Sequence, residues 1–371
     1  MRILQVYKDY HPVVGGIENH IKMLSEALVQ RGHQVTVLAT DPTMRTHVQN
    51  IAGVHVIKAG RLATVSSAPI SLRLFDWMRR LDADIVHLHF PYPIGELAYL
   101  MFGQGHPMVL SYHSDIVRQK YLLQVYRPFL YRVLARARRI LVSSANYIES
   151  STYLRPLKDK CLVIPHGTDL TRFRTTDSTA RRSEEIKQQY GAPIVLFVGL
   201  LRYYKGVSCL LEAMKSINAK LLVAGEGPMG PEWRAQAEQP ELDGKVFFLG
   251  RVSDAELVAL YHACDLFVLP AIHRSESWGA VQVEAMACGK PVVCTELGTG
   301  TSVVNQHGET GLVVAPRDTS ALAQAIQTLL SDDDLRRRMG QQAQERAHSQ
   351  FSLPRMVDRL ADVYTDVIRN N

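Results

Sequence analysis

Short hydrophobic runs alternate along the chain with longer segments in which hydrophobic residues recur every three to four positions. Val, Ile and Leu dominate the short runs, which is typical of strands buried on both faces of a sheet, and the longer segments have the period of amphipathic helices. Segment 17–30 is the clearest helix, because Ile17, Ile21 and Leu24 share one face and Gly32 follows its end. The alternation predicts β-α-β units and mostly parallel sheets.

The same alternation occurs twice. The strands predicted for the first half are 2–7, 34–40, 54–58, 84–89, 107–112, 139–143 and 160–164. Those predicted for the second half are 193–199, 220–224, 245–249, 265–269, 291–294 and 311–314, followed by helices 319–330, 334–347 and 353–368.

Segment 165–185, between the two series of strands, is polar and has no hydrophobic period, so we interpret it as an interdomain linker. The fold class predicted is therefore α/β, with two doubly wound, Rossmann-like domains, 1–170 and 171–352. In open sheets of this class ligands bind at the carboxyl ends of the strands, so the site is expected in a cleft between the domains.

Length and composition agree with two soluble domains. The chain has 371 residues, of which 46% are hydrophobic and 21% charged. The longest hydrophobic run, 192–201, is about half of the roughly 18 residues that span a bilayer, and no secretory signal is apparent, so a cytoplasmic protein is expected. The five cysteines are odd in number and dispersed, which favours thiols in a reducing compartment.

Positive charge is concentrated in the first half. The net charge is +6, of which residues 1–170 contribute +8 and the remainder −2. Segment 116–139 carries seven Lys and Arg with no acidic residue, interleaved with aromatic and aliphatic side chains. Such a segment could lie on the anionic inner leaflet of a membrane or hold a phosphate-bearing substrate, and the alternative is a buried structural helix. Without a recognised binding module it does not predict nucleic-acid binding.

Two glycine-containing loops are candidates for phosphate binding. Gly15 and Gly16 precede a predicted helix, where backbone N–H groups and the helix dipole favour an anion, although a plain tight turn is the alternative. The G-x-G-x-x-G pattern at 225–230 is interrupted by Pro228 and lacks the acidic partner of a dinucleotide site, so we interpret it as a turn.

Two further loops carry charged residues after predicted strands. Arg202 and Lys205 follow the first strand of the second domain and suit a diphosphate, although a solvated basic turn is possible on sequence alone. In the string 273–293, Glu276 precedes a helix that carries Glu284, with helix-initial N–H groups at Gly279–Val281 between the two carboxylates. That spacing suits a polyhydroxyl ligand bound at two ends with a phosphate between them.

A histidine, His113, ends a strand of the first domain and could hydrogen-bond a reacting sugar, although a lone histidine is more often structural. His87 and His89 alternate with hydrophobic residues, and we interpret them as sheet or cleft-wall residues.

Six ordered strings together resemble the GT-B glycosyltransferases, specifically the retaining family 4 group. They span nearly the whole chain: VGGIENHIKMLSEALVQRGHQVTVL from residue 14, YHSD at 112–115, VIPHGTD at 163–169, FVGLLRYYKG at 197–206, VAGEGP at 223–228, and the string beginning at 273.

The resemblance implies a role for each matching residue. Arg202 and Lys205 are expected to hold the donor diphosphate, with Gly15 and Gly16 closing on it, and Glu276 and His113 to lie near the transferred sugar. The remaining donor-site residues implied are Ser277, Trp278, Gly279, Ala280 and Val281 around the sugar and phosphates, Glu284 at the ribose, and Arg251 and Val252 at the base. Family members commonly have Phe where Trp278 stands.

The acceptor side is expected to include Asp115, Arg118 and Lys120, and the C-terminal helix, 353–371, is expected to return to the first domain. The implied reaction moves a sugar from a nucleoside diphosphate sugar to a hydroxyl of a glycan or polyprenyl-diphosphate-linked acceptor, with retention. GDP-mannose is preferred over a UDP-sugar as donor, because YHSDIVRQK resembles polysaccharide and O-antigen mannosyltransferases. No cofactor is expected, and no essential metal, since no D-x-D motif occurs.

Other proteins that use two such domains remain alternatives. They are a sugar-nucleotide 2-epimerase, a phosphorylase, for which no lysine motif for pyridoxal phosphate is visible, and a nucleotide-sugar binder without activity.

Overall fold

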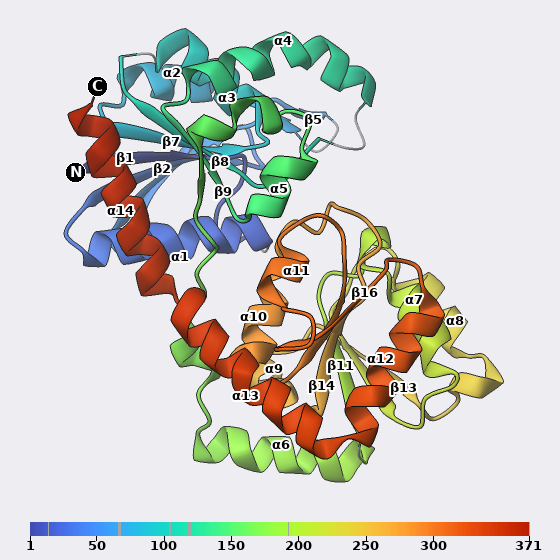
Figure 1. The fold of residues 1–371 in the computed structure, drawn as a ribbon. Coiled ribbons are helices and arrows are strands. Elements are labelled where there is room, and N and C mark those ends of the chain that lie inside the picture. Colours follow the sequence, from blue (N-terminus) through green and yellow to red (C-terminus); the bar gives the residue numbers. More distant parts are fainter. Residues whose placement is uncertain (14, 66–67, 104, 117–119, 192, 371) are drawn as a thin grey trace. The chain divides into compact units, whose positions relative to one another are not determined.

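The computed structural model describes residues 1–13, 15–65, 68–103, 105–116, 120–191 and 193–370. The chain divides into two compact units (Figure 1). Unit 1 comprises Met1–Gly167 and Leu353–Asn371, and unit 2 comprises Thr168–Ser352. Each unit is an α/β domain with its own hydrophobic core, which confirms the fold class predicted from the alternation of strands and helices.

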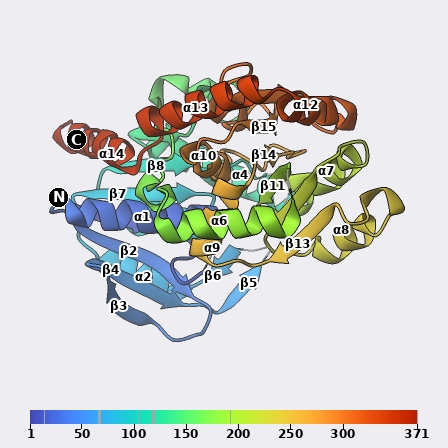
Figure 2. The ribbon, with the colours of Figure 1, turned by 90° about the horizontal axis from the view of Figure 1, so that it is seen from below.

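The sheet of unit 1 has the strand order β10-β9-β8-β7-β1-β2-β4-β3. Its strands are β1 (Arg2–Val6), β2 (Gln34–Asp41), β3 (His47–Ile51), β4 (Val54–Gly60), β7 (Ile85–Phe90), β8 (Met108–Tyr112), β9 (Arg139–Val142) and β10 (Cys161–Val163). Neighbours are parallel except β3, which pairs antiparallel with β4 at the edge seen in Figure 2. Strand order reverses between β1 and β7, so the loops that follow these strands diverge and leave room for a ligand.

The helices of unit 1 are α1 (Gly16–Gln30), α2 (Leu72–Arg80), α3 (Pro93–Phe102), α4 (Lys120–Arg136), α5 (Ala145–Ser150) and α14 (Leu353–Arg369), with a 3₁₀ segment η1 (Arg155–Lys160) and a small hairpin of β5 (Ala63–Val65) and β6 (Ala68–Ile70). Helix α14 packs beside α1, although more than 300 residues separate them in sequence (Figure 1). Arg31 donates to Asp358 across this pair, and the buried face of α14 includes Leu360 and Tyr364.

The sheet of unit 2 is parallel, with the order β13-β12-β11-β14-β15-β16. Its strands are β11 (Ile194–Val198), β12 (Lys220–Ala224), β13 (Val246–Gly250), β14 (Leu266–Leu269), β15 (Val292–Thr295) and β16 (Gly311–Val314). Numbered within the unit, this is the 3-2-1-4-5-6 order of a doubly wound sheet, and the order reverses between β11 and β14.

The helices of unit 2 are α6 (Asp177–Tyr190), α7 (Val207–Met214), α8 (Gly230–Ala237), α9 (Asp254–Ala263), α10 (Ala280–Ala287), α11 (Thr301–Val304), α12 (Thr319–Ser331) and α13 (Asp333–Gln350), with 3₁₀ segments η2 (Leu170–Phe173), η3 (Tyr203–Lys205) and η4 (Pro240–Leu242). Helices α6 and α9 pack side by side (Figure 2). The strands and C-terminal helices predicted from the sequence are confirmed to within one to three residues at each end.

The interpretation of 165–185 as an irregular linker is wrong for most of its length. Leu170 and Phe173 are buried in η2, and helix α6 begins within the segment, with the hydroxyl of Thr176 capping its first turn. Only Ser183 and Ile186 of α6 are buried, so the helix has almost no hydrophobic period to detect. The sequence reading also missed β3, in which the first four residues are exposed, and the β5–β6 hairpin.

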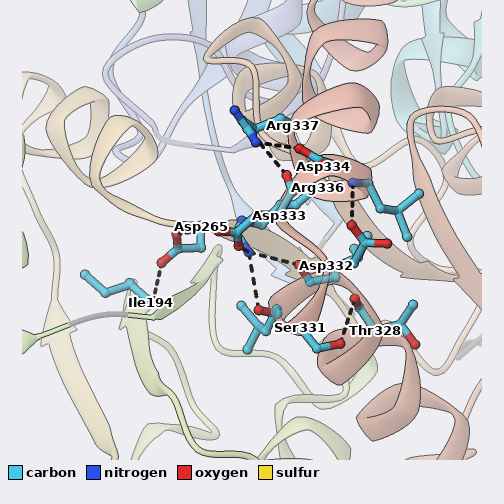
Figure 3. Close-up of polar contacts among 12 residues, drawn as sticks. Ile194, Asp265, Thr328, Ser331, Asp332, Asp333, Asp334, Arg336 and Arg337 are labelled. Atoms are coloured by element: carbon cyan, nitrogen blue, oxygen red, sulfur yellow. Dashed lines mark hydrogen bonds and ion pairs between the residues drawn. The ribbon is translucent and has the colours of Figure 1, made fainter.

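The amino edge of the unit 2 sheet is held by polar contacts (Figure 3). One carboxylate oxygen of Asp265 accepts a hydrogen bond from the backbone N–H of Ile194, joining β14 to β11. Arg336 forms an ion pair with Asp333 at 2.8 Å and lies 3.7 Å from Asp265, and Asp332 caps α13. The acidic cluster at the start of α13 is therefore structural, because it lies at the edge opposite the loops in which ligands bind.

Candidate active site

The loops that follow β11 and β14 meet at the point where strand order reverses in unit 2. These two strands are neighbours in the sheet, and their loops carry the basic pair and the first glutamate identified in the sequence. Gly206 has a φ of +68°, and a Cβ there would overlap the carbonyl oxygen of Pro270. Glycine is therefore required for the two loops to approach this closely.

Lys205 and Glu276 form a buried ion pair between these loops. The Lys205 Nζ lies 2.5 Å from Oε2 of Glu276, and each residue is 8% exposed. Burial alone would lower the pKa of Lys205, but the Glu276 carboxylate outweighs this effect and the pKa is raised. The Lys205 ammonium also lies 5.7 Å from the ring centre of Tyr204. Arg202 is exposed, so this loop offers one exposed and one buried cation.

The loop that carries Glu276 is fixed by hydrogen bonds to the chain after β15. The hydroxyl of Thr299 donates to the carbonyl oxygen of Glu276 at 2.8 Å, and the N–H of Gly300 donates to the carbonyl of Ser277 at 2.7 Å. Helix α10 begins immediately after Gly279, so its first N–H groups, including those of Ala280 and Val281, lie in the same loop. The carboxylate and these amides are thus held on one rigid segment.

The side chain of Trp278, a residue that the resemblance implies beside the sugar, lies in the hydrophobic core of unit 2. It is 3% exposed, its ring meets that of Phe351 edge-to-face at 5.4 Å, and it leaves no space for a Cβ at Gly300. The indole therefore anchors the loop that carries Glu276 to the core of unit 2.

Glu284 lies on α10 and accepts a hydrogen bond from the hydroxyl of Tyr261 at 2.7 Å. Burial raises the pKa of Glu284, while the Tyr261 hydroxyl and the nearby Arg172 act in the opposite direction. One carboxylate oxygen is thus held by Tyr261 from α9, which orients the side chain. Tyr261 was not identified in the sequence, since a tyrosine in a hydrophobic helix gives no signal of a polar partner.

Arg251 and Val252 follow β13 at the same carboxyl edge, with Arg251 exposed and Val252 partly buried. The G-x-G-x-x-G pattern at 225–230 is a turn, as predicted. A Cβ at Gly225 or Gly227 would overlap the carbonyl oxygen of Gly199 or Leu201 in the adjacent loop. These glycines are therefore explained by close backbone packing between loops.

In unit 1, Gly15 is extended and Gly16 begins α1, with the buried Glu18 in the first turn. The carboxylate of Glu18 folds back so far that a Cβ at Gly15 would overlap it. An acidic side chain thus lies beside the amides that the sequence indicated as an anion site.

The residues expected at the acceptor side are only partly placed. One oxygen of Asp115 accepts hydrogen bonds from Tyr112 and Ser151, and its backbone N–H donates to Tyr147. These contacts hold the loop after β8. Arg118 lies outside the described residues, and Lys120 is described only as the first residue of α4.

His113 is 4% exposed and follows β8, where its Nε2 lies 2.9 Å from Nδ1 of His89. Burial lowers the pKa of His113 well below its usual range. His20 and His166 stack on each other with ring centres 4.4 Å apart, and each lies 5.5 Å from the His113 ring. The sequence could not indicate this cluster, because its members come from distant segments. Among the described residues, no group of three or more His, Cys, Asp or Glu is arranged to hold a metal ion.

Two doubly wound α/β domains, one carrying a basic pair and a glutamate at its switch point, define a glycosyltransferase of the GT-B fold. The solved structure of sucrose-phosphate synthase from Thermosynechococcus elongatus has the same fold, with a TM-score of 0.83 and 24% identity over 100% of both chains.

Family models agree with this class. The model of the glycosyl transferases group 1 matches residues 179–346, and that of glycosyltransferase family 4 matches residues 14–172. The D-rhamnosyltransferase WbpZ of Pseudomonas aeruginosa is 38% identical over 95% of this chain and 92% of its own. The O-antigen chain mannosyltransferase C of Escherichia coli is 33% identical over 100% of both chains. The chain belongs to the family 4, group 1 glycosyltransferases.

Proposed function

We propose that the protein transfers a hexosyl unit, with retention of configuration, from a nucleoside diphosphate sugar to a hydroxyl of a glycan or lipid-linked acceptor in the synthesis of a cell-surface polysaccharide such as O-antigen. The observation that carries the proposal is the buried Lys205–Glu276 pair at the switch point of unit 2. In this pair Lys205 is a cation that suits a diphosphate, and Glu276 is a carboxylate that suits sugar hydroxyls. The two loops that carry them are in contact.

The donor is held by unit 2 in this proposal. Arg202 and Lys205 bind the diphosphate, since a guanidinium offers paired donors and an ammonium a compact charge. They also stabilise the negative charge that develops on the leaving diphosphate. Glu276 binds the sugar hydroxyls, and Glu284, oriented by Tyr261, accepts from the ribose hydroxyls.

For the chemical step we propose that the diphosphate leaves as the acceptor hydroxyl attacks on the same face. A phosphate oxygen takes the acceptor proton, so no protein base is required. Glu276 and His113 orient the oxocarbenium-like sugar. We propose that the reaction needs no metal, with the two cations in the role that a metal has elsewhere.

GDP-mannose is the donor we prefer over a UDP-sugar. Both relatives named above transfer hexoses of the manno series, one mannose and the other D-rhamnose, which is 6-deoxymannose. The acceptor we propose is a growing polysaccharide on a polyprenyl diphosphate.

Helix α4 supports a peripheral contact with the inner membrane leaflet. Val125 is 74% exposed and Phe129 37%, and with Arg132 they follow the i, i+4, i+7 spacing of one helix face. Tyr131 is also exposed and receives a hydrogen bond from Arg127. Basic and hydrophobic side chains together favour an anionic surface. Within the described part of the chain, no helix has both the length and the hydropathy to span a bilayer.

The proposal is tested by incubating the protein with a panel of GDP- and UDP-sugars and a polyprenyl-diphosphate-linked acceptor, with products read by mass spectrometry and the anomeric configuration by NMR. Arg202→Ala and Lys205→Ala are each expected to lower turnover by roughly 100-fold or more at saturating donor. Arg337→Ala is the matched control, since this arginine is 75% exposed on α13, near the opposite edge of the same sheet.

Near-normal turnover in both variants would contradict the diphosphate role. A free epimerised sugar without transfer would indicate the 2-epimerase, and tight binding without any product a nucleotide-sugar binder. Loss of activity in EDTA with recovery on adding Mn²⁺ would contradict the metal-independent reaction.

A further inference from the structure

Unit 1 concentrates histidines on one face of its sheet. His87 and His89 lie on β7 two residues apart, and their side chains therefore point to the same face. His20 from α1 and His113 after β8 join them, and all four are at most 5% exposed. Burial lowers the pKa of each well below its usual range, to about 3 for His87, so the rings are neutral at pH 7. A neutral imidazole has one N–H and one acceptor nitrogen.

A chain of two hydrogen bonds fixes which nitrogen of His113 carries the hydrogen. Nε2 of His89 lies 2.6 Å from the side-chain oxygen of Gln5 on β1. An amide oxygen only accepts, so Nε2 of His89 carries the hydrogen and Nδ1 of His89 is an acceptor. Nδ1 of His89 lies 2.9 Å from Nε2 of His113, which must therefore donate. His113 is left with an unprotonated Nδ1.

The Nδ1 of His113 is an acceptor that the described residues leave unused. It is buried and has no hydrogen-bond partner among the described residues. His113, His20, Ser111 and His166 line the same small cavity of unit 1. A buried acceptor without a partner costs free energy in the unliganded protein and is satisfied by a hydroxyl group.

We propose that His89 is a positioning residue, which through Gln5 fixes His113 as the Nε2–H tautomer and so presents the Nδ1 lone pair of His113 to a hydroxyl of a sugar substrate. The inference rests on the proposed function, because it requires that His113 meets the substrate. It also specifies the contact, since His113 accepts a hydrogen bond and does not donate one. The sugar hydroxyl must then be a donor, and a fluorine in its place would not substitute for it.

Three variants test the role of His89. In His89→Asn, the amide oxygen lies near the original Nδ1 and still accepts from His113, whereas His89→Leu removes that acceptor. Tyr99→Phe is the matched control, because it removes the hydrogen bond of another buried residue of unit 1, from the Tyr99 hydroxyl to the carbonyl oxygen of His106 at 2.9 Å, away from Gln5, His89 and His113. Urea unfolding shows whether each variant is still folded. A folded variant with lower activity has lost the orientation of His113 and not the fold.

The first readout is the tautomer of His113, from long-range ¹H–¹⁵N correlation spectra of histidine-labelled protein. We expect Nε2–H in the wild type, in His89→Asn and in Tyr99→Phe, and a mixture of tautomers in His89→Leu. The second readout is steady-state transfer. His89→Leu is expected to lower kcat about 10- to 100-fold at unchanged donor KM, the scale of losing an orienting partner. His89→Asn should recover most of this loss, and Tyr99→Phe should keep the kcat of the wild type.

An Nδ1–H tautomer of His113 in the wild type would overturn the inference, as would a normal kcat in a folded His89→Leu variant. An equal loss in Tyr99→Phe would also overturn it, because the effect would then be structural. Absence of sugar transfer by the wild type would contradict the proposed function instead, and the spectra would still decide the tautomer.

Discussion

The ammonium nitrogen of Lys205 lies 2.5 Å from a carboxylate oxygen of Glu276, in a buried pair that joins two loops of unit 2. Removing one partner of such a pair leaves an uncompensated buried charge. We expect Lys205→Met to destabilise the protein by about 3 kcal/mol and Lys205→Met with Glu276→Gln to recover most of that loss. Urea unfolding measures both, and equal destabilisation by the single and double changes would contradict a coupled pair.

The same pair sets a competition for Lys205 between Glu276 and a diphosphate. Glu276→Gln removes the competing carboxylate, so GDP or UDP should bind more tightly, by about 10-fold for 1.4 kcal/mol of relieved competition. Turnover should nevertheless fall, because Glu276 is proposed to bind the sugar. Calorimetric titration and a transfer assay measure the two effects. Weaker nucleotide binding in this variant would show that Glu276 does not compete with the diphosphate.

Nucleotide binding should depend on pH through Glu284. Burial raises the pKa of this carboxyl, and the hydrogen bond from Tyr261 counteracts the rise. The ionised form accepts from ribose hydroxyls, so affinity should fall as pH drops through the pKa of Glu284. In Tyr261→Phe that pKa is higher, and the fall should begin at higher pH. Affinities measured from pH 5 to 8 test this expectation, and superimposable profiles would contradict it.

Stability should have a maximum near pH 6.5, for two opposite reasons in unit 1. The buried histidines have pKa values below the ordinary 6.5, about 4 for His166 and about 3 for His87. The neutral histidines therefore contribute fully to the free energy of unfolding above pH 6.5, and this contribution is lost as pH falls toward those pKa values. Burial raises the pKa of Glu96 to about 8. Its contribution to the free energy of unfolding is therefore fully present below the ordinary pKa of 4.5 and is lost as pH rises toward 8.

Above pH 6.5 the ionisation of Glu96 lowers the free energy of unfolding by up to about 1.4 kcal/mol per pH unit. Glu96→Gln keeps an oxygen for the N–H of Tyr92, 2.7 Å away, and removes the ionisation. The variant should therefore lose the decline between pH 6.5 and 8 and keep the decline on the acid side. Urea unfolding at pH 5, 6.5 and 8 is the measurement. A parallel decline in both proteins above pH 6.5 would assign it to another group.

Membrane contact through α4 should depend on both hydrophobic and basic side chains. Phe129→Ser and Arg132→Glu are each expected to reduce flotation with anionic vesicles at low salt, since the exposed face loses an inserting ring or reverses a charge. Arg337→Ala again serves as the control on a different surface. Equal recovery of the wild type with anionic and neutral vesicles would exclude the electrostatic contact.

The sequence indicated the fold well wherever an element is buried on a whole face or throughout. Strands such as β11 and β14 are buried throughout and appear as unbroken hydrophobic runs. Helix α6 escaped prediction because its packing buries only Ser183 and Ile186, and β3 escaped because its side chains are mostly exposed. The pattern of hydrophobic residues indicates a helix or strand only to the extent that this element buries side chains.

The site shows the same division. The sequence alone determined the two series of β-α-β units, and with them the loops after β11 and β14 as the places for Arg202, Lys205 and Glu276. The tertiary structure decided which groups touch: that Lys205 pairs with Glu276, that Trp278 is buried in the core, and that Gln5, His89 and His113 form one hydrogen-bonded chain. Local pattern encodes secondary structure because it depends on neighbours in sequence. Charge state and tautomer depend on burial and partners that come from distant strands, and these exist only after the chain has folded.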